Sequence, residues 1–147
     1  YVNQTHGVQQ RILGAMEQMC GVDLSGVQPG IDGCSAPNWP IPLENLAFGF
    51  ARIADPKDLP QARADAIGRI KRAVFANPCM VARTGRFCTE VMTILGDKVS
   101  IKTGPEGVFC ASLPAFGLGI ALQFDDCATR RSETMMAALL RHVGVLE

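Results

Sequence analysis

The stretch "VSIKTGPEGVFCASLPAFGLGIALQF", residues 99–124, decides the fold. It divides into three apolar segments separated by short turns that are rich in glycine and proline: Val99–Lys102, Val108–Ser112 and Gly117–Phe124. Short apolar segments bounded by such turns are typical of β-strands, and short connections between consecutive strands favour antiparallel pairing. The stretch therefore predicts an antiparallel meander of three strands.

Helical patterns lie on both sides of this meander, with apolar residues recurring every three or four positions. The expected helices cover residues 5–20, 43–54, 61–76, 88–95 and 129–143. In the first of them, Val8, Ile12, Met16 and Met19 predict one buried stripe. Helices, then strands, then a final helix indicate an α/β (α+β) fold, and we expect residues 1–147 to form a single unit.

Composition limits the classes of partner. The chain has 147 residues, 48% of them hydrophobic and 19% charged, with a formal net charge of +0. Because the basic residues are scattered, there is no electrostatic argument for nucleic acid or an anionic membrane surface as a partner. No apolar run approaches the roughly 20 residues that a membrane span needs. We therefore expect a cytoplasmic protein that binds neither nucleic acid nor membrane.

Lys102 is the first candidate for chemistry. A Lys-Thr-Gly triplet on a strand lines the active site of serine acyl-transfer enzymes, and a desolvated lysine can act as a base. The alternative is an ordinary lysine on an edge strand, where a charge prevents aggregation. The partner of such a catalytic lysine lies in a Ser-x-x-Lys sequence, and the 147 residues contain none. Both interpretations stay open on this evidence.

Cys34 lies in the most unusual loop of the chain, residues 21–42. Gly30 and Gly33 flank Asp32 there, and glycine allows backbone conformations that bring the thiol close to another group. Cys34 could serve as a nucleophile, a metal ligand or a packed thiol. Asp32, two residues earlier, could orient a metal ligand or a base through a hydrogen bond. The spacing alone does not choose among these three roles.

Cys88 begins a predicted helix, where the helix dipole favours a thiolate. A buried cysteine in a capping turn is the equally simple alternative. The chain has six cysteines and no Cys-x-x-Cys pair, so most of them are expected to be small buried hydrophobic residues. Asp125 and Asp126 are a conceivable pair of acid and base carboxylates, but neighbours on a strand point to opposite faces, so we expect turn residues instead.

Five segments together resemble the bacterial asparaginase II family, and within it the Rhizobium-type L-asparaginases. They are "HGVQQRILGAM", "GIDGCSAPNWPIPLENLAFGFARIA", "GRFCTEVM", "IKTGPEGVF" and "ALQFDDCATR", in the order and approximate spacing of that family. The resemblance covers nearly the whole chain. Its most specific elements are "DGCSAPN" and "IKTGPEG".

The resemblance implies an amidohydrolase that converts L-asparagine to L-aspartate and ammonia, with a fold like serine β-lactamases and glutaminases. In such enzymes a serine attacks the amide and a lysine takes its proton. Lys102 is placed as one of these lysines, Cys34 as a zinc ligand near the substrate with Asp32 supporting that site, and Cys88 close to the same pocket. Lys102 and Cys88 are thus the expected catalytic residues. A homodimer is expected as well.

Some features depart from the family. Its members carry an N-terminal half with Ser-x-x-Lys elements and a "CSGKH"-like segment that completes the zinc site, and these 147 residues contain neither. Pro105 stands where alanine is common, and Cys127 where glycine is usual. We therefore expect the C-terminal portion of a larger asparaginase domain, active only with the remainder or a complementing chain. The alternatives are a glutaminase, a β-lactamase-like acyl-transfer enzyme, or a non-catalytic fragment that binds zinc or a partner.

Overall fold

The computed structural model describes residues 1–125 and 129–146 and has the predicted mixed α/β composition. Its described helices are α1 (Gly7–Cys20), α2 (Leu43–Ala54), α3 (Gln61–Ala76), α4 (Pro78–Ala82), α5 (Phe87–Leu95) and α6 (Thr129–His142), with short 3-10 turns η1 (Gly96–Lys98) and η2 (Pro114–Phe116). Within this described part of the chain, no helix is both long and apolar enough to cross a membrane.

The predicted meander is confirmed. Strands β3 (Ser100–Thr103), β4 (Phe109–Leu113) and β5 (Leu118–Leu122) pair antiparallel in the order β3-β4-β5. The last strand ends two residues before the expected Phe124, because the chain leaves the ladder after Leu122. A second, two-stranded sheet was not predicted: β1 (Gly30–Ile31) and β2 (Pro37–Asn38) form a small hairpin inside the loop of residues 21–42.

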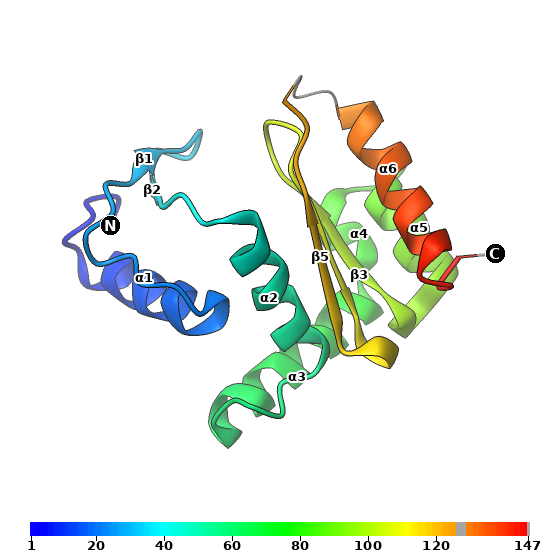
Figure 1. Ribbon diagram of the computed structural model, residues 1–147, viewed down its shortest axis with the longest axis horizontal. Coiled ribbons are helices and arrows are strands. Elements are labelled where there is room, and N and C mark those ends of the chain that lie inside the picture. Colours follow the sequence, from blue (N-terminus) through cyan, green and yellow to red (C-terminus); the bar gives the residue numbers. More distant parts are fainter. Residues whose placement is uncertain (126–128, 147) are drawn as a thin grey trace.

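The meander lies between two layers of helices (Figure 1): α2 covers one face, and α5 and α6 cover the other. Side chains alternate between the two faces of a strand, so every second residue of β4 points toward α5 and α6. The main core gathers on that side. It consists of Cys88, Val91, Met92, Val99, Ile101, Phe109, Ala111, Leu113, Leu122, Met136, Leu140 and Val145.

On the other face, α2 approaches the sheet closely at Gly119. A Cβ placed on Gly119 would lie 2.0 Å from the carbonyl oxygen of Ala47 and 2.3 Å from the backbone nitrogen of Ala51. Such contacts are far inside van der Waals distance, so only glycine fits here. This glycine allows the backbone of α2 to rest on β5.

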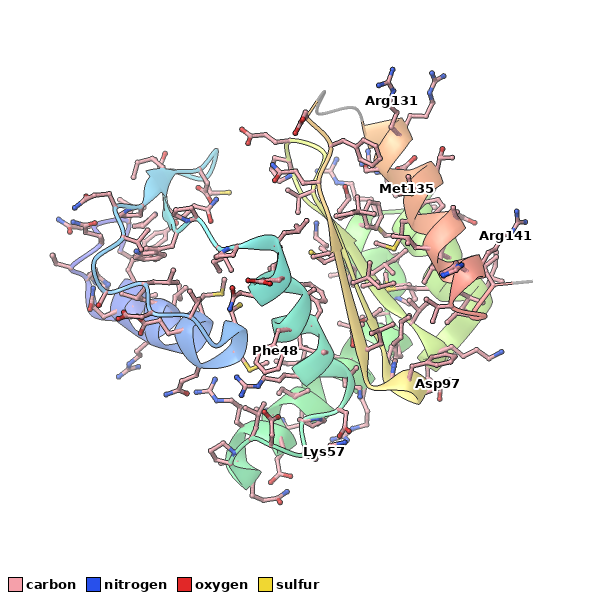
Figure 2. The ribbon with its side chains drawn as sticks, viewed as in Figure 1. Phe48, Lys57, Asp97, Arg131, Met135 and Arg141 are labelled. Atoms are coloured by element: carbon pink, nitrogen blue, oxygen red, sulfur yellow. The ribbon has the colours of Figure 1, made fainter. Side chains whose placement is uncertain are left out.

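The predicted buried stripe of α1 is wrong in its first half, where Val8 is 45% and Ile12 43% exposed. The reason is that α1 packs against α2 through its C-terminal end, where Cys20 is buried. Figure 2 shows Phe48 on the side of α2 that faces α1. Arg52 of α2 stacks over the Phe48 ring at 4.4 Å and donates to backbone carbonyls at the end of α1.

Two other helix predictions need adjustment. α3 ends at Ala76 as expected, but Pro78 then occupies the first turn of a new helix, α4, because a proline there loses no intrahelical hydrogen bond. The final helix begins at Thr129 and ends one residue earlier than expected, at His142. Asp126 and Cys127 lie outside the described residues, while Asp125 lies in a turn as predicted.

Candidate functional site

Lys102 emerges from β3 on the face of the sheet that α2 covers. Gly119 and Ala121 point toward α2, Cys110 pairs with Ala121, and Lys102 pairs with Cys110 across the next strand. The Lys102 side chain is exposed, and its Nζ donates a hydrogen bond to the backbone carbonyl of Thr103 at 2.5 Å. An exposed amine at the end of a strand remains accessible to a small molecule.

Cys88 lies on the opposite face of the sheet, in the first turn of α5, and is 1% exposed. Burial raises the pKa of its thiol, and the charge of Glu133 raises it further. A backbone hydrogen bond with Thr103 and the positive charge of Lys102 act in the opposite direction. Because burial is the largest of these effects, Cys88 is held as a neutral thiol, unlike the thiolate that the helix dipole would favour.

Thr103 connects these two residues. Its carbonyl accepts the hydrogen bond from Lys102, and its backbone also lies against the Cys88 thiol. The strand thus lies between the two side chains, and the Lys102 charge still acts on the Cys88 thiol across it. The sequence had suggested both residues separately, but not this link.

A cavity of about 400 Å³ opens at the N-terminus of α5, lined by Gly85, Arg86, Phe87, Arg130 and Glu133. Arg86 and Glu133 are also among the charges that shift the pKa of Cys88. Glu133 comes from α6 and is distant in sequence, so no local pattern could have indicated its proximity. The cavity thus lies next to Cys88, on the side of the sheet away from α2.

Cys34 and Asp32 lie together at the tip of the β1–β2 hairpin. One carboxylate oxygen of Asp32 accepts hydrogen bonds from the backbone N–H groups of Cys34 at 2.8 Å and Ala36 at 3.0 Å. Ser35, between them, adopts a left-handed conformation with φ of 63°. Asp32 therefore shapes the turn, and the turn leaves the Cys34 thiol exposed.

The hairpin does not by itself form a metal centre. Within residues 1–125 and 129–146 no group of three or more His, Cys, Asp or Glu side chains is placed to hold a metal ion. A cysteine thiolate is a preferred zinc ligand, whereas Asp32 already uses one oxygen in the turn. The exposed Cys34 thiol is at most one ligand, and the described residues do not supply a complete set.

The structure brings the sequence candidates together in two pairs. Asp32 lies with Cys34 on the hairpin, and Lys102 lies with Cys88 around β3. In Figure 1, α2 stands between the hairpin and the sheet.

All of residues 1–147 match the family model described as L-asparaginase II. The chain belongs to this family. A search among curated proteins gave no match. Membership in the L-asparaginase II family indicates a hydrolase with a small-molecule amide such as asparagine as substrate, and it agrees with the segments around Cys34, Cys88 and Lys102 that suggested the resemblance.

Proposed function

We propose that the protein takes part in the hydrolysis of L-asparagine to L-aspartate and ammonia. The observation that carries the proposal is the match of residues 1–147 to the L-asparaginase II family. The position of Lys102 on β3 fits the proposal on one condition: the segment that brings the serine to this strand must also cover the Lys102 amine, because a lysine acts as a base only when it is desolvated.

The proposed reaction proceeds by nucleophilic catalysis. A serine hydroxyl attacks the side-chain amide carbon, Lys102 accepts its proton, and the proton passes to the departing nitrogen, which leaves as ammonia. Water then hydrolyses the resulting ester to release aspartate. The 147 residues contain no Ser-x-x-Lys sequence, so the proposal takes the nucleophile from a serine outside them.

Cys88 and Thr103 have a supporting part in this proposal. The Thr103 carbonyl holds the Lys102 amine, and the neutral Cys88 thiol lies behind the same strand. We assign Cys88 as a positioning residue, because its buried sulfur does not reach solvent. Serine β-lactamases and glutaminases use the same serine-and-lysine chemistry. We therefore propose that the complete domain has a fold like theirs.

The test is ammonia release from L-asparagine by the protein at its natural length, with glutamine and a chromogenic β-lactam as competing substrates. We expect turnover of asparagine, and a loss of at least about a hundredfold in Lys102→Ala. Lys57→Ala is the matched control, since Lys57 is exposed and pairs only with the neighbouring Asp55 among described residues. Preferred turnover of glutamine or the β-lactam would replace the asparaginase proposal with one of those alternatives.

A second proposal concerns zinc. We propose that Cys34 supplies one thiolate ligand to a zinc ion whose other ligands come from outside the described residues. In differential alkylation with mass spectrometry, zinc at micromolar concentration should slow labelling of Cys34. It should not slow labelling of Cys79, which is likewise exposed but belongs to α4. Equal rates with and without zinc would refute the ligand role, and zinc binding without any hydrolysis would favour a non-catalytic binding protein.

A further inference from the structure

A strained residue stands at the base of the loop that leads into α5. Arg83, directly after α4, has φ of 71° and ψ of 162°. Backbone conformations in this region are essentially reserved for glycine, because a Cβ meets backbone atoms there. Other residues keep such a conformation only where the surrounding structure holds them, and they gather at functional sites. Arg83 therefore requires a restraint.

The Thr89 hydroxyl provides this restraint. Oγ1 of Thr89 donates a hydrogen bond to the Arg83 carbonyl at 2.6 Å and lies 3.4 Å from the Pro78 carbonyl, so it contacts both ends of α4. Thr89 is 7% exposed, whereas Arg83 and the loop residues 84–86 are exposed. Because a buried hydroxyl without this partner would be left unsatisfied, the bond is costly to break.

Thr89 also connects this loop to the candidate site, since it follows Cys88 in the first turn of α5. The backbone of Thr103 forms a hydrogen bond with the Cys88 thiol, and the Thr103 carbonyl accepts the hydrogen bond from the Lys102 amine. The loop of residues 83–86 joins α4 directly to α5 and so determines where this first turn lies. A shift of the turn would reach Lys102 through Thr103.

We propose that Thr89 is a positioning residue: its hydroxyl holds Arg83 in the strained conformation and thereby fixes Cys88 in the first turn of α5. Through Thr103, it also fixes the Lys102 amine. Without the hydroxyl, Arg83 relaxes to an ordinary conformation and the turn moves. Arg83→Gly removes the strain, because glycine adopts this conformation freely, and the restraint is then no longer required. The part of the proposal that concerns Lys102 rests on the proposed hydrolysis of asparagine.

The test measures alkylation of the buried cysteines by iodoacetamide in the protein at its natural length. Thr89→Val replaces the hydroxyl by a methyl group of similar size, and Thr89→Ser keeps the hydroxyl. We expect Thr89→Val to speed labelling of Cys88 by at least about tenfold and to leave the rate at Cys110 within about twofold. Thr89→Ser should label like the original protein. In the Arg83→Gly background, Thr89→Val should change the Cys88 rate by less than about threefold.

Three labelling results would overturn the proposal. An unchanged Cys88 rate in Thr89→Val would show that the hydroxyl does not hold the turn. Faster labelling of Cys88 and Cys110 together would show that the hydroxyl supports only the stability of the whole fold. An equal effect of Thr89→Val with and without Arg83→Gly would show that the hydroxyl does not restrain a strained Arg83.

Asparagine turnover tests the link to the reaction. Thr89→Val should lower turnover by at least about tenfold, because a displaced base is less effective, and Thr89→Ser should keep it. Unchanged turnover together with faster labelling of Cys88 would overturn the role of Thr89 in the reaction. A protein that hydrolyses no asparagine at all would refute the proposed function, and the labelling rates would still decide whether Thr89 holds Arg83.

Discussion

The exposed fractions of individual cysteines separate two kinds of thiol. Cys34 and Cys79 are exposed, while Cys20, Cys88 and Cys110 are buried. Most of the described cysteines are thus buried, as expected, but the packed-thiol alternative for Cys34 is wrong, because the turn built by Asp32 directs this residue outward. The three buried thiols all have raised pKa values, since burial disfavours the charged thiolate.

This difference predicts the order of alkylation. With iodoacetamide at neutral pH, Cys34 and Cys79 should react first, and Cys88 at least about a hundredfold more slowly, because its sulfur must wait for local opening. Peptide mapping by mass spectrometry measures the rate at each site. Rapid labelling of Cys88 in the folded chain would contradict the burial of this thiol and return it to the catalytic role that the sequence suggested.

Cys110 predicts how stability depends on pH. Burial raises the pKa of its thiol from 9.0 to about 12. Between these values the unfolded chain releases a proton that the folded chain retains, so the free energy of unfolding falls as pH rises above 9. The effect is at most about 1.4 kcal/mol per pH unit, and it is absent below pH 9.

Urea denaturation at several values between pH 7 and pH 10.5 measures this dependence. The Cys110→Ala variant should show a shallower decline than the original chain, whereas Cys34→Ala should not, because Cys34 is exposed in the folded chain. Comparing variants removes the contribution of lysines and the tyrosine, which also titrate at high pH. Identical slopes in all three proteins would show that Cys110 is not buried as described.

At the scale of elements, the contact between α2 and β5 depends on Gly119. Gly119→Ala should lower the free energy of unfolding by about 2–4 kcal/mol, because the new Cβ would meet backbone atoms of α2 that cannot move independently. Gly14→Ala is the contrasting control. Gly14 lies inside α1 with nothing within 4 Å of an added Cβ, so alanine should stabilise the chain by about 0.5–1 kcal/mol.

Urea denaturation of both glycine variants gives the measurement. A neutral Gly119→Ala would mean that α2 can shift away from the sheet without loss.

The sequence predicted elements whose signals are local. Three apolar segments with glycine and proline turns were sufficient for the meander, and helical periodicity located α2 and α3 to the residue. Periodicity marks an apolar face but does not say whether another element covers it, so the outer half of α1 was wrongly expected to be buried. The hairpin β1–β2 was missed, although Asp32-Gly33 is a recognised turn signal.

In the candidate site, too, the sequence predicted what depends on neighbouring residues and missed what depends on contacts between distant elements. Local spacing singled out Cys34 with Asp32, and their hydrogen bonds lie within one short turn. The surroundings of Cys88 depend on contacts across the fold: Thr103 comes from the neighbouring strand and Glu133 from the last helix. No single stretch of sequence contains that arrangement.

Across the whole molecule, packing is uneven. The main core joins α5, the sheet and α6, and its buried members begin at Cys88. Residues 1–42 contribute α1 and the hairpin, which lie on the far side of α2 from this core (Figure 1). Local stability follows the number of buried apolar contacts around an element, so the two regions should open with different free energies.

Hydrogen exchange followed by mass spectrometry should therefore show the slowest amides in β4, where every residue is buried. Peptides from residues 1–42 should exchange faster by at least about tenfold, since α1 is anchored mainly at its C-terminal end. Arg52→Lys should widen this difference, because lysine cannot both stack on Phe48 and donate to the end of α1 through a planar fork. Uniform protection across the chain would show instead that α1 and the hairpin unfold together with the core, and Cys34 would then sit on a rigid part of the molecule.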